Sequence, residues 1–73
     1  MMEWTYSPYR HRALIIDGPF TLCTIVCTRE YATRLFQSAT IDDIMEVAKT
    51  LNQSILTPSD LHHLFPLQSQ RGI

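Results

Sequence analysis

Apolar and polar residues alternate at the start of the chain. Met2, Trp4 and Tyr6 are each separated by one polar residue. This period of two is typical of a half-buried β-strand. The sequence Ser7–Arg10 follows it and predicts a turn, because proline at the second position presets the backbone angle.

Two further segments are apolar with little alternation. They are Ala13–Ile16 and Phe20–Cys27, and Asp17–Pro19 between them predicts a reversal of direction. Because Pro19 has no N–H to donate, we expect a loop slightly longer than the tightest two-residue hairpin. Together with the first strand, these segments predict a three-stranded antiparallel sheet.

The spacing of apolar residues becomes helical after Thr28. Glu30 lies near the expected start, where the helix dipole favours an acid. Four apolar residues share one face of the predicted short helix: Tyr31, Ala32, Leu35 and Phe36.

A longer helix is predicted from Ile41 to about Asn52. Thr40 and Asp43 have the spacing of a capping box. The apolar stripe of this helix consists of Ile41, Ile44, Met45, Ala48 and Leu51, with Ile55 as a further candidate.

A last helix is predicted after Thr57, which can act as its cap. Pro58 suits the first helical position and Asp60 lies three residues past the cap. The helix is expected to end before Pro66. Its inward residues are predicted to be Leu61, Leu64 and Phe65.

These elements predict a single α+β domain over residues 1–66, with a three-stranded antiparallel sheet followed by two or three helices packed on one face. Residues 67–73 are expected to form a flexible tail. The chain has 73 residues, of which 45% are hydrophobic and 18% are charged. Enough apolar surface is available for folding, but a domain of this size buries only about 60% of its surface.

Net charge and hydropathy limit the classes of function. A formal net charge of −1 gives no broad field for attracting nucleic acids or anionic membranes. No apolar segment approaches the roughly 18 residues of a membrane span, and the first residues lack a secretory signal pattern. We therefore expect a soluble, cytoplasmic protein.

The two cysteines are the first candidates for chemistry. On a strand, Cys23 and Cys27 share a face but lie about 13 Å apart, whereas a disulfide needs β-carbons at about 4 Å. Two sulfurs on one zinc ion are at most about 4.6 Å apart, so shared ligation is also excluded. His62 and His63 point about 100° apart on a helix and do not chelate together.

The residues of catalysis are also missing. Cysteines in an apolar strand are usually inert, and no spacing of Cys23 or Cys27 to a histidine indicates a nucleophile with its base. The carboxylates are accounted for by helix caps and exposed faces. With two glycines in the chain, no glycine-rich phosphate loop can form. We expect no enzyme activity, no metal and no cofactor.

Aromatic and basic residues interleave in one segment, which contains Trp4, Tyr6, Tyr9, Arg10 and Arg12. Such residues can stack on bases and contact phosphates. They also suit an edge strand whose arginines prevent unwanted strand pairing. Nucleic-acid binding through this segment is therefore kept as an alternative. DNA binding through a helix-turn-helix at Ile41–Phe65 is not expected, because its second helix, Pro58–Phe65, carries an acid and no lysine or arginine.

The third strand is predicted to be apolar on both faces. The two sets are Phe20, Leu22 and Val26 on one face, and Cys23, Ile25 and Cys27 on the other. Helices that follow the sheet can cover one face, so the second needs a crossing helix, a second copy or another protein. We expect an intermolecular contact, with the cysteine-bearing face less covered.

The segment Leu61–Phe65 also fits a leucine-x-x-leucine docking helix, although packing in the core is favoured.

The middle of the chain resembles small phage and prophage open-reading-frame proteins, in which a β-hairpin precedes an A-x-R-L-φ-x-x-A segment and an amphipathic helix. The matching residues are Ala32, Arg34, Leu35, Phe36 and Ala39, followed by Ile41–Leu51. The likeness covers about half of the chain. It departs at Ser38–Thr40, where such proteins often have alanine and proline. The resemblance implies a phage-encoded accessory protein or inhibitor that acts on a host complex in the host cytoplasm.

The function predicted from the sequence is therefore a small, non-catalytic protein-binding module. Its partner is another protein or a second copy of itself, and membrane association is not expected. The residues predicted to bind the partner are Trp4, Tyr6, Tyr9, Arg10, Arg12, Cys23, Ile25 and Cys27. The alternative is a nucleic-acid-binding or regulatory protein that uses its aromatic and basic N-terminal segment.

Overall fold

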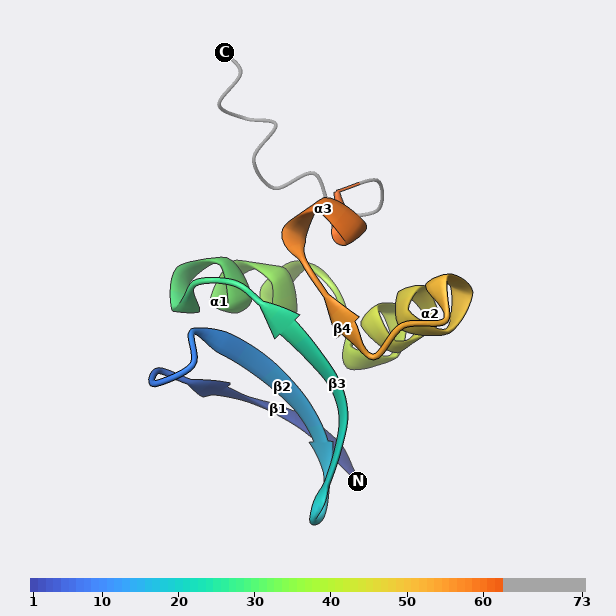
Figure 1. Cartoon of the computed structure of the whole chain (residues 1–73), viewed down its shortest axis with the longest axis horizontal. Coiled ribbons are helices and arrows are strands. Elements are labelled where there is room, and N and C mark those ends of the chain that lie inside the picture. Colours follow the sequence, from blue (N-terminus) through green and yellow to red (C-terminus); the bar gives the residue numbers. More distant parts are fainter. Residues whose placement is uncertain (63–73) are drawn as a thin grey trace.

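A computed structural model describes residues 1–62 of the chain as a mixed α+β fold (Figure 1). The elements of the described part are β1 Met2–Ser7, β2 Arg12–Asp17, β3 Phe20–Val26, α1 Arg29–Ser38, α2 Ile41–Leu51, β4 Ile55–Leu56 and α3 Pro58–Leu61. The predicted α+β class and the order of hairpin before helices are confirmed.

The sheet has one more strand than the sequence predicts. Its order is β1-β2-β3-β4, and the first three strands are antiparallel as expected. β4 pairs in parallel with β3, and the Thr24 amide donates to the Ser54 carbonyl oxygen at 2.8 Å. Ile55 therefore belongs to a strand and not to the stripe of α2.

Both turns of the antiparallel part are tight. The predicted turn at Ser7–Arg10 is confirmed, since the Arg10 amide donates to the Ser7 carbonyl oxygen at 3.3 Å. The expectation of a longer second loop is wrong, because Asp17 pairs directly with Phe20. In a two-residue loop the closing N–H belongs to the following residue, so proline costs nothing there. Gly18 supplies the left-handed backbone, with φ of +61°.

Short-range hydrogen bonds start the two longer helices. Thr28 caps α1, because its hydroxyl oxygen accepts from the Tyr31 amide at 3.1 Å. α2 has the predicted capping box: the Thr40 amide donates to the Asp43 carboxylate at 3.0 Å, and the Asp43 amide donates to the Thr40 hydroxyl at 3.1 Å. Asn52 ends α2 in a left-handed conformation, with φ of 56°.

α3 begins as the sequence predicts. Pro58 occupies its first turn, and the Asp60 carboxylate accepts from the Thr57 amide at 2.9 Å. Leu61 is fully buried. The predictions for His63, for the end of the helix at Leu64, Phe65 and Pro66, and for the tail 67–73 lie outside the described residues.

The core lies between one face of the sheet and the helices. α1 and α2 both contribute buried residues to one cluster with the same face of the sheet. Cross-strand pairs put Ala13 with Ile25 and Ile15 with Cys23 on this side. The buried apolar residues of the described chain are Ala13, Ile15, Cys23, Ile25, Cys27, Ala32, Leu35, Ala39, Ile44, Val47, Ala48, Leu56 and Leu61.

Candidate functional site

The face of the sheet opposite the helices carries three rows of side chains. We call it the open face. Residues that pair across neighbouring strands share a face, and so do residues i and i+2 of one strand. The rows run across the sheet as Glu3–Ile16–Thr21, Thr5–Leu14–Thr24–Ile55 and Ser7–Arg12–Val26. Four of the ten residues are large and apolar, and three are threonines, of which Thr24 is buried.

No described helix covers the open face. Val26 is 38% exposed and Ile55 is 56% exposed. Leu14 and Ile16 are half-buried by their neighbours in the sheet, whereas Ala13 and Ile15 on the helix side are fully buried. A contiguous apolar surface of this kind, surrounded by polar residues, is typical of an interaction site.

Two opposite charges mark the two ends of the open face. Glu3 lies in the row at one end, and Arg12 lies in the row at the other end. Within residues 1–62 neither side chain forms an ion pair. The Arg12 Nε donates to the Arg10 carbonyl oxygen at 3.5 Å, which is a long and weak hydrogen bond. No residue in the described part of the chain therefore neutralises either charge.

The expectation that Cys23, Ile25 and Cys27 lie on the less covered face is wrong. They are 1%, 0% and 9% exposed and belong to the core. The helices fold back onto the face that these residues share with Ala13 and Ile15. No contact between the folded chain and a partner can therefore be made mainly by these three side chains.

The alternation of outward and inward residues along β2, counted from Arg12, identifies the open face correctly. Arg12 begins this strand, so the polar guanidinium places Leu14 and Ile16 on the outward side. A sequence interpretation that starts the strand at Ala13 loses this signal. Leu22 was predicted to share a face with Val26, but a bulge in the pairing of β2 with β3 shifts it toward the helices.

Trp4 and Tyr6 contact their own chain. The Trp4 ring stacks on the Phe36 ring of α1, with centroids 4.6 Å apart and planes 9° apart. The Tyr6 hydroxyl donates to the Cys27 carbonyl oxygen at 2.7 Å, and the Arg29 guanidinium lies 5.1 Å from the centre of the Tyr6 ring. Through these aromatic residues, the helix-facing side of β1 packs on α1 and bonds to the backbone at Cys27.

The loop between β1 and β2 places the other predicted residues together. Tyr9 is 93% exposed, Arg10 is exposed, and Arg12 is half-exposed at the start of β2. Arg29 joins them from α1 through its contact with Tyr6. We call Tyr9, Arg10, Arg12 and Arg29 the basic tip. It contains three of the five lysine and arginine residues in the part of the chain that is described.

The thiols are protected rather than reactive. Both cysteines are free and buried. Burial raises the pKa of Cys23 and of Cys27, because it disfavours the thiolate. Burial also raises the pKa of the neighbouring Tyr31 hydroxyl. Neither thiol therefore has the lowered pKa of a catalytic nucleophile. No group of three or more His, Cys, Asp or Glu residues within 1–62 is arranged to hold a metal ion.

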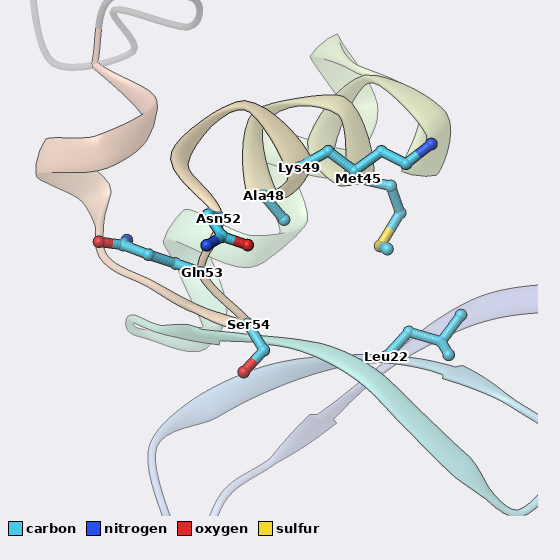
Figure 2. A pocket seen from close by; sticks show the side chains of 7 residues that line it. All are labelled: Leu22, Met45, Ala48, Lys49, Asn52, Gln53 and Ser54. Atoms are coloured by element: carbon cyan, nitrogen blue, oxygen red, sulfur yellow. The ribbon is translucent and has the colours of Figure 1, made fainter.

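An open groove of about 390 Å³ lies between β3, α2 and residues 52–54, which lead from α2 into β4 (Figure 2). Figure 2 shows Leu22 of β3 facing Met45 of α2 across this groove. Its rim is polar and includes Lys49, Asn52 and Gln53. The residue pattern gives no sign of this groove, because Leu22 reaches the helix side only through the bulge.

No family model matches this chain, and the comparisons with curated proteins and with solved structures also yield no match. None of the helices within residues 1–62 combines the length and the apolar character that crossing a membrane requires.

Proposed function

We propose that this protein is a small, non-catalytic protein-binding module whose contact surface is the open face of the sheet. The observation that carries the proposal is the row structure of that face, in which Leu14, Ile16, Val26 and Ile55 are contiguous and uncovered by any described helix. Burying such side chains against a partner contributes about 25 cal/mol for each Å² of apolar area.

The chemistry of the described residues favours binding over catalysis. The buried thiols have raised pKa values, and the carboxylates of Asp43 and Asp60 accept helix-capping hydrogen bonds. The resemblance to small phage proteins supports a role as a phage-encoded inhibitor or accessory protein that acts on a host complex.

Photo-crosslinking tests the proposed surface. A benzophenone amino acid is placed at Ile16 on the open face or, as a control, at Glu46 on the exposed side of α2. We expect one protein partner to crosslink at Ile16 and not at Glu46. The identified partner is then purified and its affinity for the chain is measured.

Two conservative variants measure the contribution of the apolar side chains. Val26→Thr and Ile16→Thr retain β-branched shapes that suit a strand. We expect each to weaken binding by about ten-fold, which corresponds to about 1.4 kcal/mol. Thr33→Ala, on an exposed position of α1, is the control. Unchanged affinity in both open-face variants would refute the proposed surface.

A second candidate function uses the basic tip to bind nucleic acid. The specific observation is that Arg29 lies 5.1 Å from the centre of the Tyr6 ring and so adds a cation to the end of β1 that leads into the exposed Tyr9 and Arg10. Affinity for single-stranded DNA or RNA should then fall steeply with salt, and Arg10→Ala should reduce the salt dependence. Binding that is absent at low salt would remove this candidate.

A further inference from the structure

We propose that the partner of the open face is a second copy of this chain, packed sheet against sheet with the two-fold axis running across the strands. The proposal rests on the proposed function, because it assigns an occupant to the same surface. It predicts a symmetric dimer in which the middle row of one copy contacts the middle row of the other.

The arrangement of rows supports this axis. An isologous contact must be complementary to itself. A two-fold axis along the row Thr5–Leu14–Thr24–Ile55 places each of these residues opposite its own copy. The two sheets then run with their strands aligned, as in sheet-on-sheet packing. Threonine and leucine side chains at the centre can approach closely without burying a charge.

The same axis brings the opposite charges together. It reverses the order of the outer rows, so the row of Glu3 in one copy faces the row of Arg12 in the other. The aliphatic part of Arg12 then covers Ile16 of the second copy, and its guanidinium reaches Glu3 on the adjacent strand. Two such pairs form at the two ends of the interface. Neither charge has an ion-pair partner within residues 1–62 of a single copy.

The small area of the face favours a weak dimer. Six residues along a strand and four strands across give a face about 20 Å long and about 19 Å wide. Two copies would bury roughly 800 Å² in total, which is below the roughly 1,200 Å² of stable specific interfaces and in the range of weak, transient contacts. We therefore expect a dissociation constant in the range of tens of micromolar or weaker.

Sedimentation equilibrium across dilution tests the dimer. We expect the wild-type chain to shift from two copies to one as it is diluted through the micromolar range. Glu3→Arg and Arg12→Glu should each raise the dissociation constant by at least ten-fold, because each places like charges opposite one another. The double variant should restore the wild-type value within about three-fold. Arg34→Glu and Glu46→Arg, on exposed helix positions, are the matched controls.

A crosslink identifies the face that is used. Ile55 lies near the proposed axis and at the far edge of the sheet from β1. The Ile55→Cys variant should form a covalent dimer through a short bismaleimide, whereas a dimer formed through the β1 edge would keep the two positions apart. The buried Cys23 and Cys27 serve as internal controls for non-specific reaction.

The outcomes separate this inference from the proposed function. Any one of four results overturns the self-association. The first two are a chain that stays monomeric at millimolar concentration and a dimer that neither single charge reversal weakens. The other two are a double variant that fails to restore the dimer and a dimer that forms without the Ile55 crosslink. If a different protein still crosslinks at Ile16, the proposed function stands without it. Circular dichroism of each variant confirms that loss of the dimer is not loss of the fold.

Discussion

Trp4 of β1 and Phe36 of α1 form a parallel stack, with ring centroids 4.6 Å apart. The contact joins the edge strand of the sheet to a helix that begins after the whole antiparallel part is complete. It explains why the aromatic side chains of β1 serve the fold more than an external partner.

Phe36→Ala should lower the free energy of unfolding by about 2 kcal/mol, since it removes a half-buried ring and the stacking of that ring on Trp4. Trp4 is the single tryptophan of the chain, so its fluorescence reports the change directly. Gln37→Ala, at the exposed neighbouring position, is the control. An unchanged emission spectrum in the folded Phe36 variant would contradict the stack.

Thr40→Ala should destabilise the protein by about 1 kcal/mol, because it leaves the Asp43 amide without its capping oxygen. Thr50→Ala, near the end of the same helix, should have no such cost and should slightly favour the helix. Urea unfolding followed by circular dichroism measures both variants. Equal destabilisation by the two changes would show that the cap contributes nothing.

Gly18→Ala should cost about 1 kcal/mol through backbone strain alone. The residue has φ of +61°, and nothing lies within 4 Å of the position that a β-carbon would occupy. Gly18→Asn should cost less, because asparagine tolerates the left-handed region better. The midpoint temperature of thermal unfolding should therefore be highest with glycine at position 18, lower with asparagine and lowest with alanine. The reverse order of asparagine and alanine would argue against strain as the cause.

The two residues of β4 should respond very differently to truncation. Leu56 is fully buried and Ile55 is 56% exposed. Leu56→Ala should lower the free energy of unfolding by about 3 kcal/mol, whereas Ile55→Ala should cost less than about 1 kcal/mol in dilute, monomeric protein. Chemical denaturation at low protein concentration tests this difference. A small effect at Leu56 would mean that β4 does not close the core.

Stability should fall at alkaline pH. Burial raises the pKa of Cys23 and Cys27 in the folded chain, so above the ordinary thiol value of 9.0 the unfolded chain releases protons that the folded chain keeps. The free energy of unfolding then decreases as pH rises, and it does not depend on these groups well below that value.

Urea unfolding between pH 7 and pH 10 measures this effect. Cys27→Ala should flatten the decrease, because one of the two shifted groups is gone. Tyr31, with a raised pKa as well, adds a decrease of the same sign above its ordinary value of 10.0. A stability that rises between pH 8.5 and pH 10 would contradict the burial of the thiols.

The helices could be predicted because their signals are local. The side chain of Asp43 bonds to a backbone group three residues away, and so does that of Asp60. A short sequence window contains the whole interaction, so spacing alone identifies the helix start. The same holds for the turn after Ser7, in which proline needs no distant partner.

The assignment of the open face failed because it depends on distant parts of the chain. The sequence of β3 does not indicate which face of the sheet the later helices cover, since Ile25 and Val26, on opposite faces, are both apolar. β4 was missed for a related reason. Its two residues gain strand character only by pairing with Thr24 and Ile25, which precede both helices in the sequence.

The parallel pairing of β4 has a consequence for the newly made chain on the ribosome. β1, β2 and β3 can pair as soon as they emerge, because each turn between them is short. The edge of β3 stays unpaired until Ile55 and Leu56 have been synthesised and have left the exit tunnel. During that interval the nascent sheet exposes an unpaired strand edge next to its apolar face. A chaperone that binds unfolded chains can bind the sheet at this stage.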